Sequence, residues 1–191
     1  MESAIKLEFY EHIKIANVTF KNIIGPLEIA ANICINSLKN DGKILIFGNG
    51  GSAADAQHFA AEMVGKYKNE RKGLPAIALT TDTSSLTSIG NDFGYERVFD
   101  RQVEALAKKN DVVIGISTSG RSENVINALK LSQTIGCKTI GLSGGDGGEM
   151  NEVCEVNLIV PSEDTPRIQE MHIVIEHTIC QLVDDALKKI N

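Results

Sequence analysis

Residues 43–55 read KILIFGNGGSAAD, and residues 112–124 read VVIGISTSGRSEN. In both stretches an apolar run suited to a buried strand leads into a loop of glycine and small polar residues, and a helix-forming stretch follows. Two strand–loop–helix units of this kind predict parallel strands whose loops meet at the carboxyl ends of the sheet. Open α/β folds bind their ligands at that edge, so the repeat also predicts where a binding site lies.

Three further runs resemble these two strands. All five are short and apolar without clean alternation, as expected of strands that are buried on both faces. The expected strands are residues 43–47, 76–79, 112–116, 138–142 and 156–160. Helical stretches lie at 52–64, 83–89, 96–108, 122–135 and 166–189, the last with Thr165 as its N-cap and Pro166 in its first position. We therefore predict one α/β domain, residues 1–191, in which residues 43–191 form the core around a five-stranded, parallel, doubly wound sheet.

The segment of residues 1–40 is expected to be helical. Apolar residues recur at spacings of three and four from Ile5 to Ile24, and Gly25-Pro26 predicts a break before a second helix that ends at Asp41-Gly42. Further apolar residues lie off the main stripe, so the apolar surface is wider than one sheet face requires. We predict that this N-terminal helical pair is used in oligomerisation. The alternative is a pair of helices that are simply over-wide in their apolar surface.

Bulk composition excludes several classes of protein. The chain has 191 residues and a formal net charge of -6, with no run of Lys or Arg, so no nucleic-acid partner is expected. No uninterrupted apolar run reaches the roughly 18 residues of a membrane span. Charged residues among the first 25 positions argue against a signal peptide. We expect a cytoplasmic protein whose cysteines, Cys34, Cys137, Cys154 and Cys180, are thiols.

The loop after residues 112–116 is the strongest candidate for an anion site. It offers the hydroxyls of Ser117, Thr118, Ser119 and Ser122, together with free amides at a helix N-terminus. Gly120 lets the backbone come close to a ligand. The sequence predicts a phosphate here; the alternative is a Ser/Thr-rich turn in which Ser122 is an ordinary N-cap.

The glycine loop of residues 48–53 is a second candidate binding loop. It matches a loose GxGxxG/A pattern, but the acidic residue expected about 20 positions later is missing, and no Gly-Lys-Ser/Thr follows. Nucleotide binding is therefore disfavoured, and the glycines are better explained by backbone contact with a sugar.

Two helices carry candidate metal ligands. His58 and Glu62 are four residues apart, and Gln169 and His177 share one broad side of the last helix. These side chains are zinc donors by type, but each pair taken alone is better explained as surface residues. Asn91-Asp92 offers groups for sugar hydroxyls, or merely an Asx turn.

Taken together, these motifs resemble the phosphoheptose isomerases of the sugar-isomerase (SIS) domain family. The resemblance covers nearly the whole chain in order and rests on residues 49–52, 91–94, 117–120 and 167–170 with His58, Glu62 and His177. It implies a homotetrameric cytoplasmic enzyme that converts D-sedoheptulose 7-phosphate to D-glycero-D-manno-heptose 7-phosphate through an enediol. The implied reaction would begin the supply of heptose for the core of lipopolysaccharide or lipooligosaccharide, or for another bacterial surface saccharide.

The resemblance also implies roles for single residues. One zinc ion per subunit would be held by His58, Glu62, Gln169 and His177, with Glu62 and His177 as the acid/base pair. Substrate contacts would come from Asn49, Gly50, Gly51, Glu62, Asn91, Asp92, Ser117, Thr118, Ser119, Ser122 and Gln169, to which we add Ser52 as a phosphate donor.

The ligand set raises a geometric difficulty. Gln169 and His177 are eight residues apart, about 12 Å along a helix axis, whereas zinc–ligand bonds are about 2 Å long. Either both side chains lean inward, or one ligand comes from a neighbouring copy, or Gln169 lies outside the regular helix. We predict active sites at subunit interfaces.

Two non-catalytic functions compete with the isomerase. A close relative within the family binds the bacterial replication initiator, and other SIS domains sense a sugar phosphate next to a DNA-binding segment. The complete set of His58, Glu62, Gln169 and His177 favours the enzyme, and the 42 residues before the first strand lack the basic character of a DNA-binding segment.

Overall fold

A sheet of five parallel strands, in the order β2-β1-β3-β4-β5, forms the centre of the computed structural model, which describes residues 1–188. The strands are β1 (Ile44–Gly48), β2 (Ala76–Ala78), β3 (Val112–Ser117), β4 (Lys138–Gly144) and β5 (Val156–Val160). In β1 and β3 every residue is buried, because helices cover both faces. The predicted fold class and all five predicted strands are confirmed.

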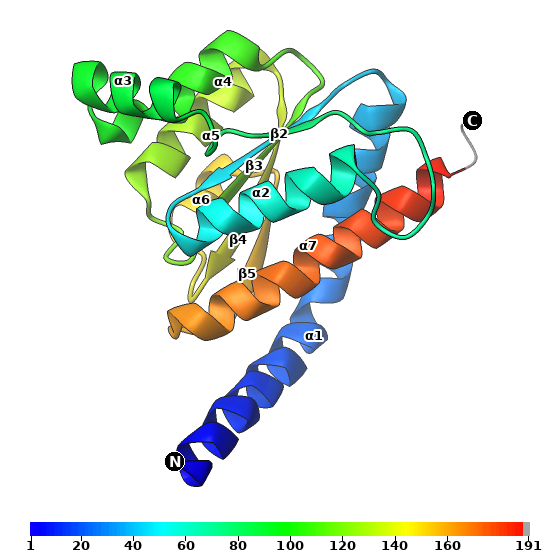
Figure 1. The fold of residues 1–191 in the computed structure, drawn as a ribbon, viewed down its shortest axis with the longest axis vertical. Helices are drawn as coiled ribbons and strands as arrows, with labels where there is room; N and C mark the ends of the chain where they lie inside the picture. The colour runs from blue at the N-terminus through cyan, green and yellow to red at the C-terminus, as the bar shows by residue number, and fades with distance from the viewer. Residues whose placement is uncertain (189–191) are drawn as a thin grey trace.

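Alternate residues of the strands face two separate apolar layers. Ile44 and Ile46 of β1 pack with the helices α1 (Glu2–Lys39), α2 (Gly51–Val64) and α7 (Thr165–Leu187). Leu45 and Phe47 face the opposite layer, which contains residues of α4 (Asp100–Leu106), α5 (Glu123–Ile135) and α6 (Met150–Val153). Figure 1 shows α3 (Thr83–Phe93) at the outer edge of that second layer. The fold is therefore doubly wound, and it places α2 and α7 together on one face.

The expected break at Gly25-Pro26 is wrong, because α1 runs through it as one helix of 38 residues. A proline inside a helix costs about 3 kcal/mol relative to alanine, since it cannot donate a backbone hydrogen bond. On either side of it Ile23 and Leu27 are buried, as are Ala30 and Cys34 further along. Burying one large aliphatic side chain contributes about 1.5–3 kcal/mol. Packing against the domain therefore outweighs the cost of Pro26, and the predicted helical pair is a single helix.

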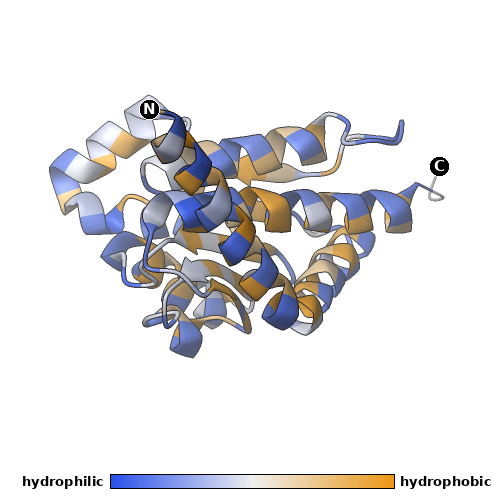
Figure 2. Cartoon of the chain, turned by 90° about the horizontal axis from the view of Figure 1, so that it is seen from below, coloured by the Kyte–Doolittle hydropathy of each residue, from blue (hydrophilic) through white to orange (hydrophobic). Residues whose placement is uncertain are grey.

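The first half of α1 projects from the domain as an arm (Figure 1). Figure 2 shows apolar residues on several sides of the helices, and on the arm Ile5, Phe9, Ile13 and Phe20 are exposed. By length and composition α1 is also apolar enough to cross a membrane. Its second half, however, is part of the apolar core, and core helices pass the same test.

Three smaller elements differ from the expectations. The predicted helix 96–108 is a 3-10 turn, η1 (Tyr95–Arg97), followed by the shorter α4. The short helix α6 was not predicted. Asp164, and not Thr165, is the N-cap residue of α7, so Pro166 lies in the first turn but at the second helical position and not at the expected first. Residue 189, at the end of the predicted last helix, lies outside the described residues.

His172 attaches α7 to the sheet. Its side chain is fully buried, and Nε2 donates a hydrogen bond to the carbonyl of Ser143 in β4 at 3.1 Å. Burial lowers the pKa of His172 from 6.5 to about 4, and the hydrogen bond to Ser143 opposes that shift only in part. Nδ1 is buried and has no partner among residues 1–188, so protonation there would place an unpaired charge in the core.

We predict that His172 makes the fold less stable in acid. Because its folded pKa lies below the unfolded value, the unfolded chain binds more protons between pH 6.5 and pH 4, and stability falls as the pH is lowered through that window. Between pH 7.5 and 5.0 this contribution amounts to about 2 kcal/mol. His172→Gln keeps an amide donor for Ser143 but cannot titrate. Urea unfolding at both pH values should show a smaller acid loss in the variant, and equal losses in the two proteins would contradict the assignment.

Candidate functional site

The Ser117–Ser122 loop brings three hydroxyls together where β3 ends and α5 begins. Ser117 Oγ lies 2.9 Å from Ser122 Oγ and 3.4 Å from Ser119 Oγ. Ser122 is the N-cap residue of α5, but its hydroxyl bonds to Ser117 and makes no cap bond. Thr118 is half-buried in the same turn. The hydroxyls and the helix N-terminus together form a concave set of donors that suits a small anion.

Gly120 fixes the shape of this loop. It has a φ of +64°, and a Cβ at this position would collide with the carbonyl of Gly147 in the loop between β4 and α6. Its own carbonyl accepts a hydrogen bond from the Met150 amide at 3.3 Å. Glycine is therefore required twice, by the backbone angle and by the close approach.

The glycine loop after β1 is joined to the first turn of α5 by two side-chain amides. Asn49 Nδ2 donates to Asn124 Oδ1 at 2.9 Å, and Asn124 Nδ2 donates to Asn49 Oδ1 at 3.0 Å. The hydroxyl of Tyr95 also donates to Asn49 Oδ1, at 3.1 Å. Asn124 is 4% exposed. Neither Asn124 nor Tyr95 was predicted, although Asn124 lies in the first turn of the helix that the anion loop precedes.

The start of α2 lies against α7. Gly50, with a φ of +58°, is the N-cap residue of α2, and Ser52 is buried in its first turn. A Cβ on Gly51 would collide with the side-chain amide of Gln169. Gly51 is therefore the residue that allows Gln169 to reach the beginning of α2.

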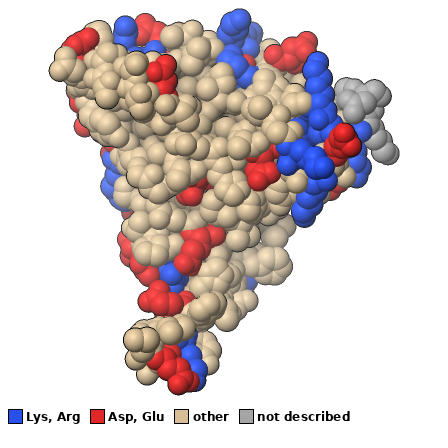
Figure 3. Space-filling view, in the orientation of Figure 1, with Lys and Arg blue, Asp and Glu red and all other residues tan. Residues whose placement is uncertain are grey.

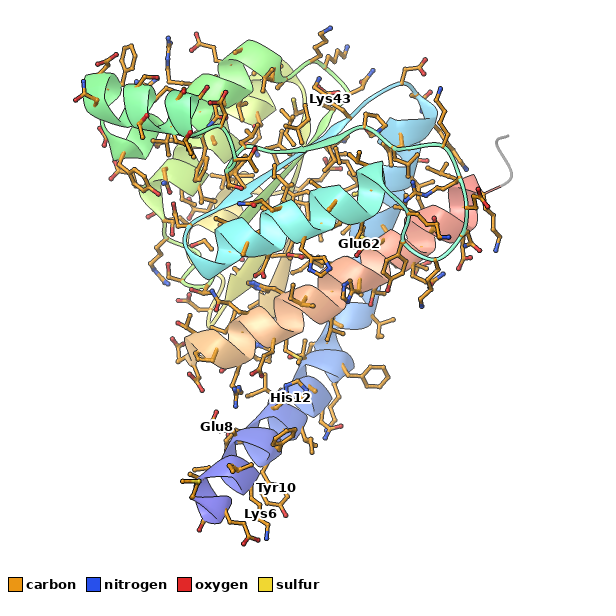
Figure 4. All side chains as sticks on the ribbon, in the orientation of Figure 1. Lys6, Glu8, Tyr10, His12, Lys43 and Glu62 are labelled. Atoms are coloured by element: carbon orange, nitrogen blue, oxygen red, sulfur yellow. The ribbon has the colours of Figure 1, made fainter. Side chains whose placement is uncertain are left out.

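Further along the same two helices, His58, Glu62 and His177 converge. One ligand atom from each lies within 4.8 Å of the others. The Nε2 atoms of His58 and His177 are 3.0 Å apart, and His58 Nε2 is 3.4 Å from Glu62 Oε1. Figure 4 shows Glu62 between α2 and α7. The spacing of His58 and Glu62 predicted their common face, and the packing of α7 adds His177.

Gln169 is not among these three residues. It lies beside Gly51, and it belongs to the regular helix α7 together with His177. The possibility that Gln169 sits in a turn outside the helix is thereby excluded. Within one chain, Gln169 accompanies the glycine loop, which is its place in the predicted substrate-binding set.

Asn91 and Asp92 lie apart from the other candidates, on the exposed last turns of α3. Asn91 Nδ2 donates to Asp92 Oδ1 at 2.8 Å. Their connection to the glycine loop runs through Tyr95, three residues after Asp92, which contacts Asn49.

Two carboxyl groups near the three converging side chains have buried oxygens that lack hydrogen-bond partners in the part of the chain that the structure describes. Both carboxyl oxygens of Glu176 and Oδ2 of Asp55 are buried and unpaired within the described residues. Desolvation, followed by the charge of Asp55, raises the pKa of Glu176 well above its ordinary value. Desolvation also raises the pKa of Asp55, and the nearby His58 opposes that rise. Glu176 was not predicted, because adjacent helix positions normally point to different sides.

Comparison with known proteins identifies the family. The model of the SIS domain matches residues 9–144 of the chain. The phosphoheptose isomerase of Aliarcobacter butzleri is 66% identical over 187 residues, which cover 98% of this chain and 99% of that relative. The phosphoheptose isomerase of Helicobacter hepaticus is 56% identical over 96% of this chain and 93% of its own. The structure of the phosphoheptose isomerase GmhA from Neisseria gonorrhoeae has a TM-score of 0.92 and 46% identity, covering 96% of this chain and 98% of that one. The resemblance inferred from the motifs is confirmed.

We predict that Asn124 contributes more to stability than its small size suggests. Asn124→Ala removes both amide bonds and leaves part of Asn49 unsatisfied, which should lower the free energy of unfolding by about 1–3 kcal/mol. Asn127→Ala, one turn later on α5, removes a single bond to the carbonyl of Glu96 and is the matched control. Urea denaturation measures both, and an equal loss in the two variants would show that the amide pair adds nothing.

Proposed function

This chain belongs to the phosphoheptose isomerase family of SIS-domain proteins, and we propose that it converts D-sedoheptulose 7-phosphate to D-glycero-D-manno-heptose 7-phosphate. It is accordingly an aldose–ketose isomerase, the activity for which its relatives are named. The observation that carries the proposal for this chain is the convergence of His58, Glu62 and His177 on the helices that also meet at the glycine loop. We propose that the product supplies heptose for a bacterial surface saccharide such as lipopolysaccharide, and that the enzyme works in the cytoplasm.

The phosphate is proposed to bind in the Ser117–Ser122 loop. The net charge of -6 gives no general attraction for an anion. On the face shown in Figure 3, the largest group of Lys and Arg side chains lies beside the C-terminal end of α7. Local donors must therefore hold the phosphate, and the three facing hydroxyls with the N-terminus of α5 provide them. Thr118 and the buried Ser52 are proposed as additional donors.

The sugar is proposed to lie along the start of α2. Gly50 and Gly51 expose backbone there, and Asn49 and Gln169 border the same loop. Asn91 and Asp92 would bind sugar hydroxyls. His58 follows Gly51 by seven residues, about 10 Å along the helix, so a sugar lying along this stretch would extend toward the three converging side chains.

The three converging side chains are suited to zinc. Two imidazoles and a carboxylate are common zinc ligands, and tetrahedral zinc with nitrogen bonds of about 2.0–2.1 Å separates two such nitrogens by roughly 3.3 Å. The observed separation of the His58 and His177 Nε2 atoms is 3.0 Å. When bound, one zinc ion per subunit would supply a Lewis acid that polarises the sugar carbonyl. Gln169 of a neighbouring copy is proposed as the fourth protein ligand, because Gln169 of the same chain lies at Gly51.

Isomerisation requires one proton to move between C1 and C2 and another between their oxygens. We assign the carbon proton to Glu62, which takes it from C1 of the ketose and returns it to C2 of the enediol. His177 is assigned the transfer between the two oxygens, through a ring nitrogen that is not bound to zinc. The side chain of Glu62 is 27% exposed and therefore accessible to substrate.

A homotetramer with active sites at subunit interfaces is proposed. The exposed apolar residues of the α1 arm need a covering surface, and a second copy would provide one. Gln169 lies away from His177 within one chain. In an assembly, Gln169 of a second copy could complete the set of zinc ligands.

The central test is turnover of sedoheptulose 7-phosphate followed by NMR, with wild-type protein and Glu62→Gln in parallel. The wild type should form the aldose, and Glu62→Gln should be at least about 100-fold slower because it lacks the proton acceptor. The variant should still bind inorganic phosphate with unchanged affinity. No aldose from wild-type protein would refute the isomerase and favour the non-catalytic alternative, and wild-type turnover by the variant would refute the role of Glu62.

Ser119→Ala tests the phosphate loop. Losing one hydrogen bond to a charged group costs about 1–3 kcal/mol, so Kd for inorganic phosphate should rise roughly 5- to 150-fold. Thr134→Ala removes an exposed hydroxyl at the opposite end of α5 and serves as the control. Isothermal titration gives both constants. Unchanged binding by Ser119→Ala would exclude its hydroxyl as a phosphate donor.

A further inference from the structure

Asp184 holds the loop of residues 65–72, which follows α2, against the side of α7. Its carboxylate accepts hydrogen bonds from Arg71 Nε at 2.6 Å, Asn69 N at 2.7 Å, Asn69 Nδ2 at 2.9 Å and Lys68 N at 3.3 Å. The side chains of Arg71 and Asp184 are 3% and 0% exposed. Arg71 also donates to the carbonyls of Glu62 and Met63. The loop is therefore fixed to both helices that carry the converging side chains.

The charge state of Asp184 matches this role. Burial alone would raise its pKa, but the hydrogen bonds from Asn69, Arg71 and Lys68 together hold the pKa of Asp184 below its ordinary value. The carboxylate is ionised at neutral pH and pairs with the Arg71 guanidinium. A buried, multiply bonded pair of this kind is costly to break, because one charge would be left unpaired.

Because Asp184 fixes the loop of residues 65–72, Tyr67 in that loop is held next to His177. Its ring centroid lies 5.6 Å from that of His177, with an angle of 36° between the planes. The ring of His58 contacts the same imidazole edge-on, at a centroid distance of 5.0 Å and an angle of 61°. The imidazole of His177 thus has an aromatic neighbour on α2 and another on the loop. Lys68 Nζ lies 5.2 Å from the Tyr67 centroid.

The contact is made by the tyrosine ring alone. Its hydroxyl forms no hydrogen bond within the described residues, and Tyr67 is only half-buried. A ring at this position restricts rotation of the imidazole about its side-chain bonds, and the direction of Nε2 depends on that rotation. Groups that orient the ligands of a metal commonly affect affinity or activity 10- to 100-fold without touching the metal.

We propose that Tyr67 is a positioning residue for the isomerase site, whose ring holds the His177 imidazole with Nε2 directed at His58 and Glu62. The inference rests on the proposed function for its chemical meaning. The orientation of the His177 imidazole does not depend on the proposed function, and it can be measured without substrate or metal.

Three variants separate orientation from general stability. Tyr67→Leu removes the ring, and Tyr67→Phe keeps it. Leu74→Ala is the matched control, because Leu74 is half-buried against the same core close to the loop. In metal-free protein, NMR of the His177 ring protons should show loss of a ring-current shift in Tyr67→Leu and its retention in Tyr67→Phe and Leu74→Ala. Chelator competition with zinc alone should then show about 10- to 100-fold weaker binding for Tyr67→Leu only. In turnover assays kcat should fall with little change in KM.

The outcomes distinguish the two proposals. A wild-type protein that binds no zinc or produces no aldose would count against the proposed function. The NMR comparison would still show whether the Tyr67 ring orients the His177 imidazole. Unchanged His177 resonances in Tyr67→Leu would overturn the positioning role. The same loss of zinc affinity in Leu74→Ala and Tyr67→Leu would also overturn it, because the effect would then follow from stability.

Discussion

The parallel packing of α2 and α7 on one face of the sheet is the constraint on which the site depends. At one end Gly51 admits the side chain of Gln169, and at the other Asp184 binds the loop that leaves α2. His58 and His177 face each other between these two ends. A slip of one residue would move a helix by about 1.5 Å. Such a slip would break the contact at Gly51 or the one at Asp184, and it would also separate the two imidazoles. The register that packs the two helices best is therefore also the register that brings the site residues together.

Much of the architecture follows from local pattern. Fully apolar strands such as β3 need helices on both faces, and that requirement leads directly to a doubly wound parallel sheet. The same reasoning places the Ser117–Ser122 loop and the glycine loop at one edge, because parallel strands end together. Four-residue spacing correctly put His58 and Glu62 on one face of a helix.

Features that depend on contacts between distant segments were not predictable in the same way. Pro26 predicts a break by every local rule, yet the burial of Ile23 and Leu27 keeps the helix continuous. Asn124 becomes part of the site only because its amide meets Asn49, 75 residues earlier in the chain. The position of Gln169 beside Gly51 depends on the offset of α7 relative to α2 along their common direction. The spacing of residues within either helix gives no information about that offset.

The packing of α1 also determines the order in which the chain can fold. Within this domain α1 is made before the sheet, but its apolar second half is buried in the core together with residues of β5 and α7, which follow the other strands in the chain. Contacts between segments so far apart in sequence form slowly. Folding from the N-terminus during synthesis therefore cannot complete this domain. Its core closes only once α7 has been made, and until then α1 keeps an apolar surface that molecular chaperones are suited to cover.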